Sequence, residues 1–369
     1  MERFLVVDNK VPAAATHALI IGVGDYPHLE RGSGPLSAAA DGMGQLTSPP
    51  LSALAFAEWL RTKYDNPSAP LATLALLLSE KAPSGWAEPA TTANVMAATE
   101  AWWERGRKSE DDVLIFFFCG HGVSQGNEMS LLLRDFGARA ADPYANAIDF
   151  KNFRLGMGRA RALRQFFFVD ACRSSSDTFA GSGEYHGAPI IAPNLNEFRP
   201  KKAPVFFSTL AGDAAYGRAG QMTLFTEALL DGLNGRGASK QNGPWQVFST
   251  RLTEYLTFVM ERSGQGQVQV PVLEGGSLMF HHSGGTPTVP LFISCNPEHA
   301  NGQAALAYCE KGKGVEKRPA FDPAPWEVTV AAGIVDLSAE FPAGGPFQST
   351  QQSESVQPPY QRIMLPVWP

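Results

Sequence analysis

Continuous apolar runs alternate with amphipathic segments along the first three quarters of the chain. The runs are rich in β-branched and aromatic residues, which indicates strands buried on both faces, and they cover residues 17–23, 71–78, 111–120, 164–171 and 204–208. The segments between and after them repeat apolar residues at helical spacing, and they cover residues 52–64, 91–105, 149–164, 225–233 and 247–263. This order predicts an α/β fold with a mostly parallel sheet that helices cover on both faces.

The pattern changes near His282, where short alternating segments punctuated by Pro and Gly replace the apolar runs. Alternation of apolar and polar residues is typical of strands with one face in solvent. A chain of 369 residues also exceeds what a single hydrophobic core usually supports. We therefore expect two domains, residues 1–281 and residues 282–369, the second a smaller all-β domain of the immunoglobulin-like sandwich type.

The composition narrows the functional class and the compartment. A net charge of -6 and an isoelectric point near 5.7, without a basic run, argue against nucleic acid as a partner. The N-terminus lacks the layout of a signal peptide, and no apolar stretch approaches the roughly 20 residues that cross a bilayer, so we expect a cytoplasmic protein that does not bind membranes. The four cysteines form no CxxC pair, so we predict neither a disulfide framework nor a metal or other cofactor.

Two reactive side chains follow neighbouring apolar runs: His121 after residues 111–120 and Cys172 after residues 164–171. The carboxyl ends of parallel strands share one edge of a sheet, so we expect the two residues to converge there. An imidazole can take the proton of a thiol and then protonate a leaving amine, and the amides of Gly122 and Cys172 are candidate oxyanion donors. Alone, Cys172 would more often be a buried structural thiol, but its conjunction with His121 favours catalysis.

The segments CGHG (119–122) and DACR (170–173) resemble the two catalytic motifs of the caspase, metacaspase and paracaspase superfamily. HALIIGVGDYPHL resembles the first strand and turn of that family, and FFSTLAGDAAYG resembles its substrate-binding strand. The resemblance covers roughly residues 15 to 280. It implies a three-layer sandwich with a six-stranded, mostly parallel sheet, and a cysteine endopeptidase with Cys172 as nucleophile and His121 as acid/base. It also implies that Ser208, Asp213 and Tyr216 bind the substrate.

The resemblance bears on which bond is cut. Caspases that cut after Asp place an arginine after the aromatic residue of the substrate-binding strand, where this sequence has Gly217. Asp170 matches the acidic residue with which metacaspases and paracaspases bind Arg or Lys, and a carboxylate can pair with a guanidinium. We therefore expect cleavage after Arg or Lys. The alternative is that Asp170 only structures its loop, because Asp is common in turns.

The expected long loop after Cys172, residues 173–203, contains RPKKAP, in which Lys201 and Lys202 are candidate sites for processing by the enzyme itself or by an upstream protease. The expected partners are protein substrates, with an activating protease or signalling protein as a further partner. The main alternative is a caspase-like signalling scaffold that does not cleave. A nucleotide binder, suggested by GVGDY, is a weaker alternative because the later Gly of a dinucleotide motif is missing. We do not predict calcium dependence.

Overall fold

The computed structural model of the chain describes residues 2–11, 13–79, 87–125, 128–172, 187–199, 201–208, 219–240, 243–263, 277–318 and 322–369. These residues form two compact units, one comprising residues 1–230 and 256–278 and the other residues 231–255 and 279–369. The change of unit at residue 279 lies close to the domain boundary expected after residue 281. The second unit also takes in residues 231–255, so the boundary at 281 stays a prediction.

A seven-stranded sheet organises the first unit, with strand order β1-β3-β2-β5-β9-β10 and β4 paired with β3. Its strands are β1 (Leu5–Asp8), β2 (Thr16–Gly22), β3 (Leu71–Leu78), β4 (Glu88–Pro89), β5 (Val113–Gly120), β9 (Arg164–Ala171) and β10 (Val205–Phe207). Every pair is parallel except β1 with β3. The expectation of a mostly parallel sheet is correct, and the sheet has one strand more than the six expected.

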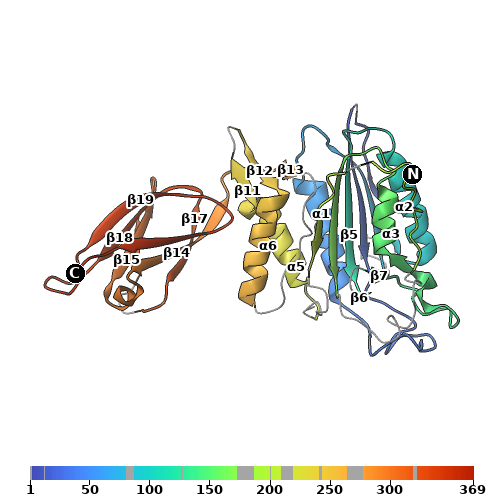
Figure 1. The fold of residues 1–369 in the computed structure, drawn as a ribbon, viewed down its shortest axis with the longest axis horizontal. Helices are drawn as coiled ribbons and strands as arrows, with labels where there is room; N and C mark the ends of the chain where they lie inside the picture. The colour runs from blue at the N-terminus through green and yellow to red at the C-terminus, as the bar shows by residue number, and fades with distance from the viewer. Residues whose placement is uncertain are drawn as a thin grey trace. The chain divides into compact units, whose positions relative to one another are not determined.

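Helices cover both faces of this sheet, with α1 on one face and α2 and α3 on the other (Figure 1). The helices of the chain that the structure describes are α1 (Ser48–Lys63), α2 (Thr92–Gly106), α3 (Phe150–Met157), α5 (Leu224–Asp231) and α6 (Ser249–Ser263). The short helices are η1 (Pro143–Asn146), η2 (Gly232–Arg236) and η3 (Glu298–Gln303). None of these helices is both long and apolar enough to span a membrane.

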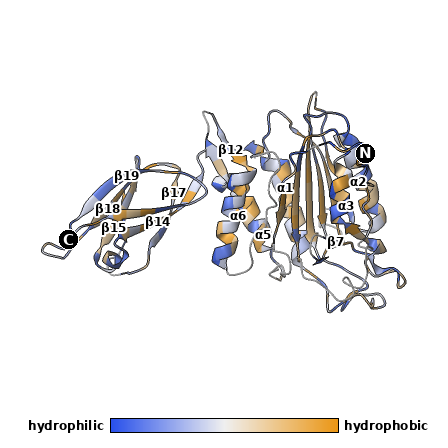
Figure 2. Cartoon of the chain, in the orientation of Figure 1, coloured by the Kyte–Doolittle hydropathy of each residue, from blue (hydrophilic) through white to orange (hydrophobic). Residues whose placement is uncertain are grey.

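Aromatic side chains fill the space between the sheet and its two helical layers. Successive residues of a strand point to opposite faces, so Phe117 packs on Phe56 of α1 with ring centroids 4.8 Å apart, while Phe116 packs on Phe153 of α3 at 5.2 Å. In Figure 2 the central strands are mostly in the hydrophobic colours, whereas the amphipathic helices carry both hydrophobic (orange) and hydrophilic (blue) residues. Burial on both faces explains why these strands are continuous apolar runs rather than alternating ones.

A small antiparallel sheet, β6-β7-β8, begins immediately after His121. Its strands are β6 (Gly122–Gln125), β7 (Glu128–Leu132) and β8 (Ala147–Asp149). Asp149 then caps α3, because its carboxylate accepts a hydrogen bond from the Asn152 amide at 3.0 Å. The chain that leaves β5 thus enters a paired strand directly after His121, and the last strand of the small sheet leads into α3.

The second unit contains three sheets, ordered β11-β12-β13, β17-β14-β20 and β16-β15-β18-β19. Their strands are β11 (Ala238–Lys240), β12 (Trp245–Phe248), β13 (Met279–His282), β14 (Thr288–Asn296), β15 (Ala305–Glu310), β16 (Val315–Lys317), β17 (Trp326–Ala331), β18 (Gly333–Glu340), β19 (Thr350–Val356) and β20 (Gln361–Pro366). Leu291, Leu306 and Leu337 belong to one buried cluster that joins the last two sheets. The C-terminal part is thus built of strands, and its immunoglobulin-like character stays a prediction.

Candidate active site

His121 and Cys172 leave the central sheet at the same level. Strands β5 and β9 are parallel neighbours, and their last paired residues are Gly120 and Ala171. His121 and Cys172 are the next residues on each strand, and adjacent strands lie about 4.8 Å apart. The register therefore brings the two residues to the same edge of the sheet, as the sequence predicted. Cys172 is neither fully buried nor fully exposed.

Three contacts fix the orientation of His121. Its Nε2 lies 2.7 Å from the carbonyl oxygen of Gly44, its amide donates to the Tyr26 hydroxyl at 2.8 Å, and its ring lies 4.9 Å from the Tyr26 ring. A carbonyl can only accept a hydrogen bond, so Nε2 carries the proton and Nδ1 of the neutral ring is free to accept one. Burial lowers the pKa of His121, and the hydrogen bond to Gly44 opposes that shift.

Gly122 packs closely against the backbone of Cys172 and against Ala171. A Cβ at this position would lie 2.7 Å from the carbonyl oxygen of Cys172 and 3.0 Å from the Cβ of Ala171. Gly122 pairs with Leu131 in the β6–β7 hairpin, next to the position where the Leu132 amide donates to the His121 carbonyl at 3.0 Å. Antiparallel pairs alternate between bonded and non-bonded positions, so the Gly122 amide is not used by that ladder.

Asp170 is a buried carboxylate at the end of β9, only 3% exposed. Thr223 and Thr226 donate hydroxyl hydrogen bonds to its Oδ2, the second at 2.9 Å, and the thiol of Cys119 lies 3.5 Å from the same oxygen. Ser208 is also close to the carboxylate. Among the described residues, however, its hydroxyl forms no hydrogen bond of acceptable geometry. Burial raises the pKa of Asp170, and the surrounding donors oppose that shift.

The sequence-based search missed several residues that support the site: Tyr26, Gly44, Ser52, Thr223 and Thr226. Ser52 of α1 accepts a hydrogen bond from the Thr223 amide at 3.0 Å, which ties the Asp170 cluster to the helix on that face. Tyr26 follows β2 in the GVGDY segment, so its place at the carboxyl edge of the sheet was a usable signal. Gly44 contributes only a backbone atom, and no sequence pattern marks it.

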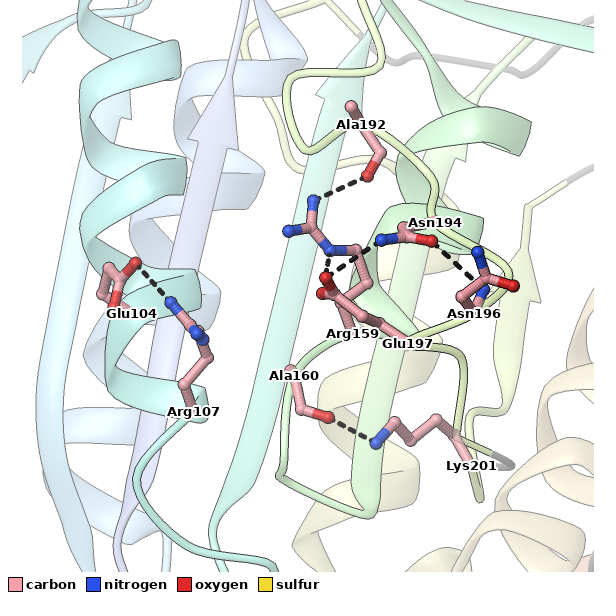
Figure 3. Close-up of polar contacts among 9 residues, drawn as sticks. All are labelled: Glu104, Arg107, Arg159, Ala160, Ala192, Asn194, Asn196, Glu197 and Lys201. Atoms are coloured by element: carbon pink, nitrogen blue, oxygen red, sulfur yellow. Dashed lines mark hydrogen bonds and ion pairs between the residues drawn. The ribbon is translucent and has the colours of Figure 1, made fainter.

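The segment that contains the predicted processing sites is packed against the first unit rather than open. Lys201 Nζ lies 2.5 Å from the Ala160 carbonyl oxygen (Figure 3). Lys202 forms an isolated parallel bridge with Arg164. Burial lowers the pKa of Lys201 to about 8, with the nearby positive charge of Arg199 as a second cause. The described residues of the predicted loop, 187–199 and 201–203, contain no helix or strand, and residue 202 extends the pairing of β10 with β9 only by an isolated bridge.

The same segment is held further upstream by an ion pair and by hydrogen bonds. The guanidinium of Arg159 pairs with Glu197 at 2.8 Å and donates to the Ala192 carbonyl at 3.0 Å, and Asn194 also donates to Glu197 (Figure 3). These contacts are exposed, so each contributes little by itself. Together they hold residues 192–197 against Arg159, in the loop after α3.

Two of the predicted substrate-binding residues, Asp213 and Tyr216, lie outside the described residues, as does Gly217. Arg173 and Ser174, directly after the nucleophile, also lie outside them. Within the part of the chain that the structure describes, no cluster of three or more His, Cys, Asp or Glu side chains is arranged to hold a metal ion.

Comparison with known proteins assigns the family. The family model described as "Caspase domain" matches residues 15–279, so the chain belongs to the caspase-domain family of cysteine peptidases. An uncharacterized protein of Sinorhizobium fredii is 30% identical over 248 residues, which cover 62% of this chain and 68% of that protein. A probable protease of a Desulfuromonadales bacterium is 31% identical over 206 residues, which cover 51% of this chain but only 24% of that longer protein.

A solved structure, that of caspase-1 from Spodoptera frugiperda, is also similar. It is 12% identical in sequence, with a TM-score of 0.44, and the match covers 76% of this chain and 97% of that one.

Proposed function

We propose that this chain is a cysteine endopeptidase in which Cys172 is the nucleophile and His121 the acid/base. The observation that supports this most is the pairing of Gly120 with Ala171, which puts the next residues of β5 and β9 at one edge of the sheet. The hydrogen bond from His121 Nε2 to Gly44 supports it further, because it leaves Nδ1 as the proton acceptor. The lowered pKa keeps this imidazole neutral, as a base must be, near neutral pH.

The chemistry follows from these groups. The Cys172 thiol gives its proton to His121 Nδ1, and the sulfur forms a bond to the substrate carbonyl carbon. The amides of Gly122 and Cys172 donate hydrogen bonds to the oxyanion. His121 then gives the proton to the amide nitrogen as the C–N bond breaks and the amine leaves. Water hydrolyses the thioester, with His121 as base, and the free thiol returns.

We propose cleavage after Arg or Lys, with Asp170 as the acidic group of the pocket. Among the described residues, Cys119, Thr223 and Thr226 all donate to Oδ2 of Asp170, which leaves Oδ1 as the oxygen for a substrate cation. A guanidinium or ammonium at Oδ1 would offset the burial that raises the pKa of this carboxylate. Ser208, which follows β10, is close to the carboxylate and completes the described part of the proposed pocket.

Processing after Lys201 or Lys202 is a further part of the proposal. Because Lys201 is bound to Ala160 and Lys202 is paired with Arg164, this stretch must detach before a protease can bind it in extended form. Detachment would free the chain on both sides of the cut. An order-to-disorder step of this kind is a known way to control a switch.

The proposal is tested by profiling a peptide library with the purified protein and with Cys172→Ala and His121→Ala. Cys309→Ala is the matched control, because Cys309 is a partly exposed thiol of the second unit. We expect cleavage by the wild type and the control, and none by the two site variants. If the wild type cleaves nothing, the chain is a caspase-like scaffold and the proposed activity is wrong. If the site variants cleave as well as the wild type, Cys172 and His121 are not the catalytic residues.

A further inference from the structure

The carbonyl that orients His121 belongs to a surface loop, and loops need specific contacts to hold one conformation. Gly44 lies between β2 and α1, in a stretch from residue 23 to residue 47 that contains no helix or strand and only isolated pairing. The Glu30 amide donates to the Met43 carbonyl at 2.9 Å. The Leu46 amide donates to the Gly24 carbonyl at 2.8 Å. These two backbone bonds flank Gly44, and neither of them involves the Gly44 carbonyl.

Gln45, the residue after Gly44, ties this loop to Tyr26 with both ends of its side chain. Its Oε1 accepts a hydrogen bond from the Tyr26 amide at 2.8 Å, and its Nε2 donates to the Tyr26 carbonyl at 2.9 Å and to the Glu30 carbonyl at 3.0 Å. An amide donor on one side and two carbonyls on the other determine which end of the side chain is oxygen. An exposed residue thus makes three hydrogen bonds to the backbone of the facing turn.

Tyr26 continues the connection to His121 from the other side. Its fully buried hydroxyl accepts from the His121 amide at 2.8 Å and donates to the Leu132 carbonyl at 3.3 Å. The Leu132 amide donates directly to the His121 carbonyl. In a regular antiparallel pair the His121 amide would donate directly to the Leu132 carbonyl. Here the Tyr26 hydroxyl lies between these two groups and bridges them.

These contacts close a ring. It runs from His121 Nε2 to the Gly44 carbonyl, along the chain to Gln45, through the Gln45 side chain to the Tyr26 backbone, and through the Tyr26 hydroxyl back to the His121 amide. We infer that Gln45 is a positioning residue for His121, acting through Gly44 and Tyr26. The inference rests on the proposed function, since it assigns Gln45 to the same acid/base.

The ring makes a prediction that separate contacts would not. If Gln45 and Tyr26 belong to one closed connection, breaking it at either place releases His121, and breaking it twice adds little. If they act separately, their effects multiply, as they do for independent sites. Gln45→Met keeps the size of the side chain without its hydrogen bonds, and Tyr26→Phe keeps the ring without its hydroxyl.

The experiment measures kcat and KM for a cleaved peptide, and the rate of Cys172 alkylation by iodoacetamide against pH, for both variants and their combination. Gln351→Met, the same change at an exposed glutamine of β19, is the matched control. We expect each variant to lower kcat about 10-fold with KM changed less than about 2-fold, as for a misplaced catalytic group. The kcat of the double variant should equal that of the single variant with the lower kcat.

Alkylation of Cys172 should also become slower at neutral pH in these variants and should follow the profile of an ordinary thiol, with a pKa of about 8.5. Wild-type kcat and an unchanged alkylation profile in Gln45→Met, or a multiplied loss in the double variant, would overturn the inference. The alkylation readout needs no proteolysis. If the wild type cleaves no peptide while Gln45→Met still changes the alkylation profile, the proposed function fails and the positioning role stands.

Discussion

Replacing Gly122 by alanine should disturb the nucleophile directly. The added Cβ would lie 2.7 Å from the Cys172 carbonyl oxygen, where ordinary contact begins at 3.4 Å, so one of the two must move by 0.7 Å (3.4 − 2.7). The Cβ of Ala171 at 3.0 Å and the Met129 Cε at 3.1 Å limit movement of Gly122 itself. The Cys172 carbonyl is a backbone group and carries its own residue with it.

Two magnitudes follow for Gly122→Ala. Overpacking of this kind costs about 1–3 kcal/mol of unfolding free energy, which urea denaturation measures. A displacement approaching 1 Å in a catalytic group lowers kcat by between about 10-fold and about 100-fold. Gly314→Ala is the matched control, because a Cβ there meets nothing in the described chain within 4 Å. Wild-type kcat in Gly122→Ala would refute the close approach of Gly122 to the nucleophile.

Three further predictions concern stability, specificity and processing. Burial lowers the pKa of His17 from 6.5 to about 4, so the unfolded chain takes up the proton first as the pH falls. The free energy of unfolding should therefore decrease by about 3 kcal/mol between about pH 6.5 and about pH 4. Urea unfolding of His17→Gln should show a flatter pH dependence, and an equally steep one would contradict this. Asp170→Asn should lower kcat/KM for an Arg peptide by at least about 30-fold, the lower limit for removing one partner of a buried charge pair; unchanged basic selectivity, or a wild-type preference for Asp peptides, would exclude Asp170 from the pocket. Mass spectrometry of the incubated protein should find a cut after Lys201 or Lys202 that the double Gln variant lacks, and a cut that persists in this variant would place processing elsewhere.

The sequence predicted those strands whose own residues determine their conformation and burial. The apolar runs at β2, β3, β5 and β9 are buried on both faces, so their pattern alone predicts them, and the residues after β5 and β9 are His121 and Cys172. The sequence-based prediction missed β1 and β4. They have only four and two residues, respectively, and depend on pairing with β3 for their conformation.

Contacts between distant segments could not be predicted in this way. The surroundings of Asp170 depend on Thr223, which lies 53 residues further along the chain, and no local pattern connects the two. The Gly44 contact with His121 spans 77 residues and uses a backbone atom, so the identity of the residue carries no signal. Lys202 was expected within the long loop after Cys172, and no local pattern marks the isolated bridge of its backbone with Arg164.

The central claim is that Cys172 is a nucleophile activated by His121, and covalent labelling tests it most directly. A peptide ending in Arg that carries an electrophilic ketone is incubated with the wild type, with His121→Ala and with Cys172→Ala, and the intact mass and labelled peptide are determined. The account predicts a single label on Cys172 of the wild type, greatly slowed in His121→Ala and absent in Cys172→Ala. A label on another cysteine, or equal labelling of Cys172 with and without His121, would contradict it.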